Sequence, residues 1–195
     1  MKIAPASKTD DFLEALLQVE ALENFTKSGL QYQTPRQNLN DLSSAEYAVQ
    51  AVKYVYPQCV IVQLGVKNTL EDQILSKMTV NVTGLTSDVL KVAGVVGLPE
   101  DDQIRAQDTK YLYIVMQRVN QEAFPSCKVK SKLSFTITEI DVDTEDEIGS
   151  YEEDYSLGEI QLNMSDYVKP EILPTGMYKD QWEQLGSNPN VAEHV

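Results

Sequence analysis

The chain has 195 residues, of which 42% are hydrophobic, and its formal net charge at pH 7 is -14. Such a length and composition fit one globular domain of ordinary size, or one and a half small ones, with a real core. The negative charge argues against nucleic acid as a partner, because phosphates require Lys and Arg, and against electrostatic docking on anionic lipid. No apolar run is long enough for a transmembrane helix, and the N-terminus lacks the apolar core of a secretory signal, so we expect a cytosolic protein.

The first 44 residues predict one helix followed by a polar linker. Met1–Thr9 is expected to be disordered. Asp10–Phe25 has apolar residues at helical spacing and acids in its first turn, where the helix dipole favours negative charge. We expect this short helix to dock on its own domain, and the alternative is a segment used by a neighbouring subunit. Gln31–Ser44 is polar and predicts the linker.

The middle of the chain predicts three consecutive strands. Apolar, β-branched and aromatic runs cover Tyr47–Tyr56, Cys59–Val66 and Ile74–Val82, separated by Pro57-Gln58 and by Asn68–Asp72. Runs bounded in this way are typical of the strands of an antiparallel meander. A meander needs a second layer to bury its apolar face, and we expect the later chain to supply it.

The later chain predicts further strands at Lys110–Val119, Lys128–Ile140 and Leu157–Met164, whereas Thr86–Asp108 stays ambiguous because glycines interrupt its apolar residues. About seven closely spaced strands with little helix between them indicate an all-β fold. We predict an immunoglobulin-like antiparallel β-sandwich with an N-terminal helix and linker. The expected divisions are residues 1–41 for helix and linker, 42–168 for the sandwich and 169–195 for a C-terminal tail.

The acidic segment Asp141–Asp154 calls for a test against calcium-binding loops. Counted from Asp141, positions one, three, five and twelve of such a loop would be Asp141, Asp143, Glu145 and Glu152. The sixth position is Asp146, where the sharp turn needs glycine, and the flanks are not two helices. A solvated acidic loop between two strands is therefore the favoured interpretation.

The sequence offers little that points to catalysis. The only histidine, His194, lies one residue from the end, and neither Cys59 nor Cys127 sits in a C-x-x-C motif. We therefore expect no nucleophile–histidine pair, no metal site and no cofactor, while hydrolysis by paired carboxylates stays open. Both cysteines lie in or beside predicted strands, so we expect buried free thiols.

Several stretches occur in an order and spacing that resemble a known family. Two strands, Tyr47–Tyr56 and Cys59–Lys67, lead into an Asn-Thr-Leu step at 68–70. Further along, the acidic stretch Asp143–Asp154 precedes a strand and the turn Ser165-Asp166-Tyr167. Upstream, Phe12–Lys27 contains leucine and glutamate and ends in a Phe-x-Lys-Ser run. Together, from about Asp10 to Gly186, these stretches resemble the C-terminal appendage region of the coatomer gamma subunit, the adaptor-like subunit of the COPI vesicle coat.

The sequence also departs from the pattern of that family. In that family a Trp-Glu-x-Leu/Val-Gly step opens a second, smaller platform subdomain, and the residues from Trp182 to Gly186 match this opening shortly before the chain ends. We therefore expect the sandwich subdomain without the complete platform. Trp182 is the candidate partner-binding residue, because exposed tryptophan often dominates interfaces. The alternative is a side chain left without its packing partner.

The resemblance implies a non-enzymatic protein-interaction module of the COPI coat in Golgi-to-ER retrograde and intra-Golgi transport. The implied partners are other coatomer subunits and, where the platform is present, an Arf GTPase-activating protein. The implied location is the cytoplasm and the cytosolic side of Golgi membranes and COPI-coated vesicles, with membrane association only through the coat. The alternatives are the appendage of a clathrin adaptor complex and a calcium-binding β-sandwich module.

Overall fold

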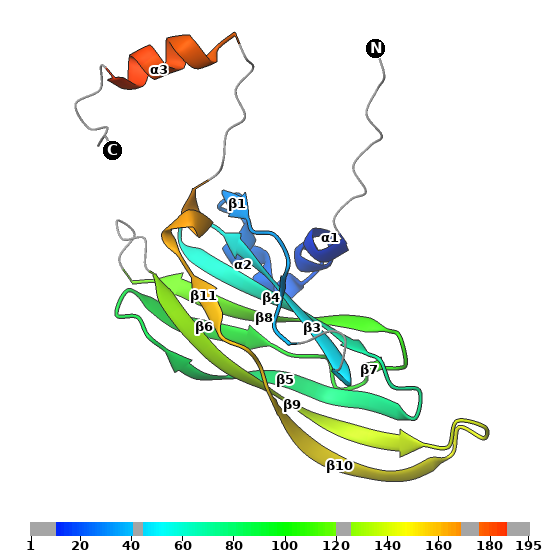
Figure 1. The fold of residues 1–195 in the computed structure, drawn as a ribbon. Helices are drawn as coiled ribbons and strands as arrows, with labels where there is room; N and C mark the ends of the chain where they lie inside the picture. The colour runs from blue at the N-terminus through cyan, green and yellow to red at the C-terminus, as the bar shows by residue number, and fades with distance from the viewer. Residues whose placement is uncertain (1–10, 41–44, 120–125, 169–175, 187–195) are drawn as a thin grey trace.

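The computed structural model describes residues 11–40, 45–119, 126–168 and 176–186. In these ranges two antiparallel β-sheets pack face to face, and a short helical segment near the N-terminus lies against one of them (Figure 1). The predicted mostly-β sandwich with a preceding helix is confirmed at this level. None of the helices in the described ranges has the length and apolar character needed to cross a bilayer. The expected disorder of Met1–Thr9 lies outside the described residues.

The helical elements are short. They are α1 (Asp11–Leu17), η1 (Glu20–Leu22), α2 (Glu23–Thr26), η2 (Met164–Tyr167) and α3 (Tyr178–Gly186), η denoting a 3-10 helix. The strands are β1 (Tyr32–Gln33), β2 (Gln37–Asn38), β3 (Tyr47–Val55), β4 (Cys59–Asn68), β5 (Gln73–Leu85), β6 (Leu90–Val96), β7 (Gln103–Ile104), β8 (Thr109–Arg118), β9 (Cys127–Ile140), β10 (Glu147–Ser156) and β11 (Ile160–Leu162).

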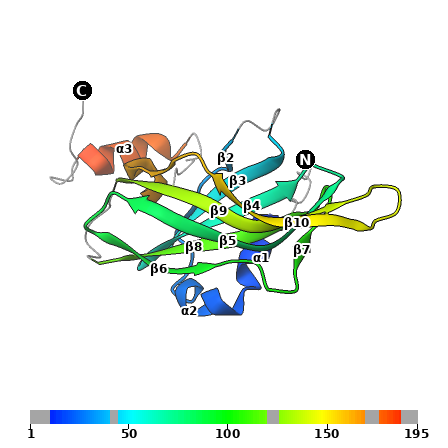
Figure 2. The same cartoon turned by 90° about the horizontal axis from the view of Figure 1, so that it is seen from below.

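The strands divide into two sheets (Figures 1 and 2). Sheet A has the order β1-β3-β4-β8-β6, with β2 also paired to β3. Sheet B has the order β10-β9-β5-β7, with β11 also paired to β9. The long strand β9 is therefore the centre of sheet B, because β5 lies along one of its edges while β10 and β11 share the other.

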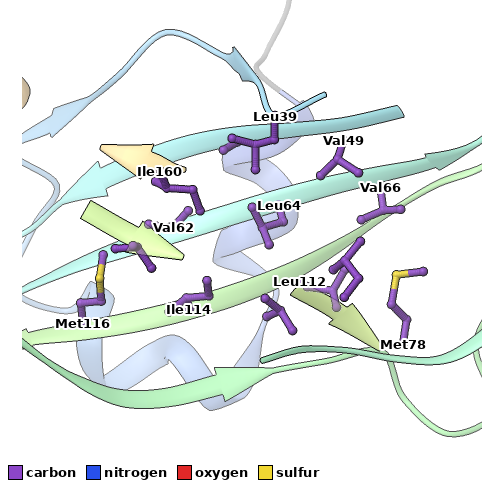
Figure 3. Packing of buried hydrophobic residues seen from close by; sticks show 14 of the residues in the cluster. Leu39, Val49, Val62, Leu64, Val66, Met78, Leu112, Ile114, Met116 and Ile160 are labelled. Carbon is purple, nitrogen blue, oxygen red and sulfur yellow. The ribbon is translucent and has the colours of Figure 1, made fainter. Parts of the chain in front are cut away.

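The main core lies between the sheets (Figure 3). Alternate residues of β4 and β8, such as Leu64 and Ile114, face Leu133 and other inward residues of sheet B. The alternation predicted for β9 is confirmed, since its apolar residues are buried and its lysines and threonines face outward. The outward residues of β4 and β8 are buried too, so sheet A has apolar contacts on both faces. Burial on both faces explains why these strands are nearly continuous apolar runs rather than alternating ones.

The predicted meander is wrong for its third strand. Strand β4 pairs with β3 on one side and with β8 on the other, while β5 crosses into sheet B. Asn68, which is fully buried, directs this crossover. Its amide donates to the carbonyl of Gln73 at 2.7 Å, and its side-chain oxygen accepts from the backbone N–H of Leu70 at 3.0 Å. The Asn-Thr-Leu step thus forms a turn between sheets rather than a hairpin within one sheet.

The N-terminal region differs from the prediction in two ways: the predicted helix is divided into shorter helices, and the predicted linker contains strands. Instead of one helix over Asp10–Phe25, the chain forms α1, η1 and α2, with an extended backbone at Val19 between the first two. The segment after it is not a free linker, because β1 and β2 pair with β3 and cover part of that strand's edge. Thr34 anchors it, since its hydroxyl accepts from the backbone N–H of Lys53 at 3.1 Å.

Two further segments differ from expectation. The ambiguous Thr86–Asp108 contains β6 and β7, the latter pairing with only two residues of β5. The acidic segment is a loop only as far as Asp146, because β10 begins at Glu147 and pairs along β9. The residues of β10 are mostly polar or charged and exposed, so the strand lacks the apolar periodicity that is the usual signal.

Candidate functional site

The N-terminal segment docks on the outer face of sheet A through Phe12. This ring packs edge-on against Tyr111 with centroids 4.8 Å apart, and the Arg36 guanidinium lies 4.2 Å from its centroid. Beneath it is Gly65, where an added Cβ would lie only 2.7 Å from Cζ of Phe12. Glycine at this position therefore lets the ring approach the sheet. The expectation that the helical segment docks on its own domain agrees with these contacts.

Burial under this segment perturbs the ionisable groups of sheet A. Cys59 is buried and unpaired, and burial raises the pKa of its thiol to about 11, partly opposed by Arg118. Burial also raises the pKa of Tyr56 and of Tyr113 to about 12. The prediction of buried free thiols is confirmed for both Cys59 and Cys127. A thiol whose pKa is raised in this way is a poor nucleophile at neutral pH.

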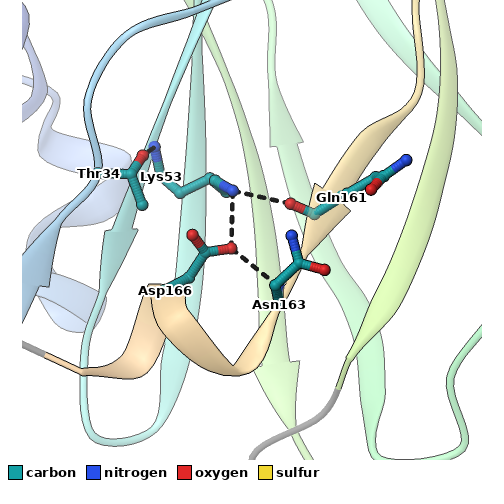
Figure 4. Close-up of polar contacts among 5 residues, drawn as sticks. All are labelled: Thr34, Lys53, Gln161, Asn163 and Asp166. Atoms are coloured by element: carbon teal, nitrogen blue, oxygen red, sulfur yellow. Dashed lines mark hydrogen bonds and ion pairs between the residues drawn. The ribbon is translucent and has the colours of Figure 1, made fainter.

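A buried ion pair between Lys53 and Asp166 joins β3 to η2 (Figure 4). Nζ of Lys53 lies 2.7 Å from Oδ2 of Asp166, and the two side chains are only 8% and 12% exposed. The same ammonium donates to the carbonyl of Gln161 at 2.7 Å, and Oδ2 of Asp166 also accepts from the backbone N–H of Asn163 at 2.9 Å. A buried ion pair needs such additional hydrogen bonds to offset the loss of hydration.

This ion pair connects both sheets to η2. Lys53 belongs to β3 of sheet A, Gln161 belongs to β11 of sheet B, and Asp166 belongs to η2. Nearby, the guanidinium of Arg118 lies 5.1 Å from the ring centroid of Tyr167. These contacts fix η2 against sheet A.

Trp182, the predicted partner-binding residue, lies on α3 and is 64% exposed. Its ring stacks on Tyr178, one turn earlier, with centroids 6.1 Å apart and planes 16° from parallel. Tyr178 and Met177 are exposed as well. The described part of the chain thus presents Trp182 as one member of an exposed apolar group rather than as an isolated ring.

The candidate calcium ligands are not gathered around one point. Asp141 accepts two backbone N–H groups through Oδ1, from Asp143 at 2.9 Å and from Thr144 at 3.1 Å, and so closes a tight turn. Glu152 lies in β10, opposite Thr136 of β9. Among the described residues, no group of three or more His, Cys, Asp or Glu has a geometry that could hold a metal ion. His194 lies outside the described residues.

The described side chains build two packed antiparallel sheets with no catalytic or metal cluster among them, which places the chain in the class of β-sandwich domains. The sequence profile of the family described as "Coatomer gamma subunit appendage platform subdomain" matches residues 11–163. The chain belongs to this family, which contains the appendage of a COPI coat subunit. The family is one of non-enzymatic coat-protein domains, in agreement with the prediction that the chain is not an enzyme.

Individual relatives agree with the family assignment. The chain is 29% identical over 205 residues to coatomer subunit gamma-2 of Bos taurus, covering 95% of this chain and 20% of that protein. It is 23% identical over 153 residues to coatomer subunit gamma of Dictyostelium discoideum, covering 77% of this chain and 16% of that one. The chain therefore spans a fifth or less of these relatives. The crystal structure of the yeast GGA1 GAE domain is similar with a TM-score of 0.42 and 12% identity, over 67% of this chain and all of that one.

The expectation of a sandwich without the platform is wrong. The family profile that matches residues 11–163 is that of the platform subdomain itself, so the matched platform residues include both β-sheets. The error came from the five-residue step at Trp182, which suggested that the platform begins there. A step of that length carries too little information to mark a subdomain boundary, and it lies beyond the matched residues.

Sequence reasoning missed the residues that organise the end of the sandwich. Lys53 interrupts the apolar run of β3, and a charged residue inside a buried strand requires a partner. That signal was available, but it does not say which of the many carboxylates provides the pairing. Asp166 is 113 positions away, and only the fold brings it to Lys53.

Proposed function

We propose that the chain is a protein-interaction module of the COPI coat, acting in Golgi-to-ER retrograde and intra-Golgi transport. The observation that carries the proposal is the family match over residues 11–163. It is supported by relatives named as coatomer gamma subunits from animals and from Dictyostelium. The net charge of -14 suits binding through protein contacts rather than directly to anionic lipid.

The partners of this module follow from the same assignment. Other coatomer subunits are the first class, and an Arf GTPase-activating protein is the second. We place the chain in the cytoplasm and on the cytosolic side of Golgi membranes and COPI-coated vesicles, held there by the coat. The finer architecture belongs to the proposal too: an immunoglobulin-like sandwich over residues 42–168, preceded by a helix and linker over 1–41, of which the linker adds β1 and β2 to sheet A, and followed by a tail over 169–195.

Trp182 is the residue we assign to partner binding. It is exposed and stacked on Tyr178, so much of its ring is already held in place before a partner arrives. Large aromatic side chains with little freedom to lose are the ones that dominate interface energies. Replacing Trp182 by Ala should reduce capture of the partner at least tenfold, which corresponds to about 1.4 kcal/mol.

The test is a pull-down from cytosol with the full chain as bait, quantified by mass spectrometry. The matched control is Leu17→Ala, because Leu17 is 63% exposed but lies on α1. Coatomer subunits or an Arf GTPase-activating protein, retained by the control and lost with Trp182→Ala, support both the function and the residue. Equal capture by all three baits removes Trp182 from the proposal. Capture of clathrin-adaptor accessory proteins instead would refute the coat assignment.

A further inference from the structure

The outer edge of sheet B is an open strand. β10 is ten residues long, and among the described residues β9 and no other strand pairs with it. Eight of its ten residues are exposed and the remaining two, Gly149 and Tyr155, are half-buried. In Figure 1 the far end of β10 and its connection to β9 extend beyond sheet A. One row of backbone N–H and C=O groups along β10 therefore faces outward, which is the arrangement that accepts an added strand.

The other strand edges are less suited to this role. In sheet A, β1 and β2 cover parts of one edge of β3, and β6 at the opposite edge is interrupted by a register shift between Val92 and Gly94. In sheet B, β7 covers the edge of β5 at Leu75 and Ser76, and β5 itself shifts register beyond Ser76. β10 pairs without a shift from Gly149 to Ser156, so it offers the longest regular open edge.

The charge of β10 selects the kind of segment that would pair with it. The strand carries Glu147, Glu152, Glu153 and Asp154 and has no Lys or Arg. Asp154 is engaged by Lys132 and Ser134, and these hydrogen bonds lower the pKa of its carboxyl. Glu152 and Glu153 extend on opposite faces of the strand, as neighbouring strand residues do. Glu152 and Asp154 share the outward face, opposite Thr136 and Ser134 of β9, so an added strand would meet two carboxylates on that face and Glu153 on the other.

The surroundings of β10 offer room for side chains of such a segment. A hollow of ≈ 430 Å³ lies beside it on sheet B, lined by Lys77, Ser134, Thr136, Glu152 and Asp154 among others. Tyr151 and Ile148 are exposed apolar side chains on the same strand. A segment with long basic side chains on the face of Glu152 and Asp154 and apolar side chains on the face of Tyr151 matches these features, because alternate residues of a strand point to opposite faces.

We propose that β10 is a docking edge for a basic, extended segment of a partner protein, which adds to sheet B as a further strand. A second copy of this chain is disfavoured as the occupant, because pairing two β10 strands would bring like charges opposite one another. This surface is separate from α3 and does not depend on the coat function proposed above. Main-chain hydrogen bonds supply affinity in this mode, and the acidic side chains supply the preference for Lys and Arg.

The test uses the full chain and a fluorescent peptide of sequence KVKVKVK, followed by anisotropy at low salt. We expect saturable binding that weakens as salt is added, since the charges are exposed. Glu152→Gln with Glu153→Gln should weaken binding roughly fivefold. The matched control, Asp88→Asn with Glu100→Gln, changes net charge equally on exposed loops beside β6 and should leave affinity within about twofold.

Three results would overturn the proposal. Equal weakening in the control pair would mean that only net charge matters. Unchanged binding of the same peptide with every backbone amide N-methylated would mean that no strand is added, because that peptide keeps its charge but donates no main-chain hydrogen bond. A concentration-dependent dimer of the chain, strengthened by Glu152→Gln with Glu153→Gln in sedimentation, would identify a second copy as the occupant.

Discussion

Replacing Asp166 by Asn tests the buried ion pair most directly. The substitution keeps the size of the side chain and an oxygen that can accept from the backbone N–H of Asn163, but it removes the charge opposite Lys53. The ammonium of Lys53 then loses its carboxylate partner and keeps the carbonyl of Gln161 as an acceptor, at a site where its side chain is 8% exposed. Breaking a buried pair from one side costs roughly 3–5 kcal/mol. That is a large part of the 5–15 kcal/mol by which a domain is ordinarily stable.

The measurement is urea unfolding followed by far-UV circular dichroism. Asp102→Asn is the matched control, because Asp102 and Lys110 are 2.8 Å apart but partly exposed, and such pairs contribute about 1 kcal/mol or less. Lys53→Met alone, and Lys53→Met combined with Asp166→Asn, complete a double-mutant cycle. We expect the double variant to be more stable than Asp166→Asn alone, because no buried charge is left unpaired. A loss for Asp166→Asn no larger than that of the control, or strict additivity of the two substitutions, would refute the reasoning.

Two further predictions concern the outer face of sheet A. Phe12→Ala should cost about 3–5 kcal/mol in unfolding free energy, whereas Leu17→Ala on the same helix should cost less than about 0.5 kcal/mol; equal effects of the two would mean that the N-terminal segment is not docked. For Cys59, the pKa of about 11 in the folded chain lies above the ordinary thiol value of 9.0. The contribution of the buried, protonated thiol to the free energy of unfolding is therefore complete below pH 9 and is lost as the pH rises through 11. The loss amounts to about 3 kcal/mol. Unfolding free energies measured at pH 8 and pH 11 should therefore fall more for the natural chain than for Cys59→Ala, and parallel curves for the two proteins would contradict the assigned burial.

The strands were easier to predict than their partners. β4 and β9 were identified almost to the residue, because apolar runs and strict alternation are local properties of the sequence. The partner of β5 was wrong, because consecutive strands usually lie side by side and nothing local in β5 indicates that it joins a different sheet. The sequence predicts a loop where β10 lies, because the residues of β10 are exposed on both faces and apolar periodicity reports only burial.

The candidate site was predictable to a smaller degree. Trp182 could be named as a candidate because exposed tryptophan often dominates interfaces and because it opens the Trp-Glu-x-Leu-Gly step, and its role in partner binding stays a prediction. The pairing of Lys53 with Asp166 could not be named, since it depends on η2 folding back against β3. The same holds for Phe12 and Gly65, whose contact requires both the helix docking and the sheet beneath it.

The distribution of burial limits which surfaces of the sandwich are accessible to a partner protein. Sheet A packs against sheet B on one face, and on the other α1, η1 and α2 cover the cluster around Tyr54, Ile61 and Val115. Sheet B, in contrast, turns Asn81, Thr136 and neighbouring polar side chains outward. A partner that leaves the N-terminal segment in place therefore has the outer face of sheet B, the edge at β10 and the aromatic pair of α3 available to it. Of these, only the β10 edge combines free main-chain groups with a strong charge preference, which is why a basic extended segment is the first ligand to test.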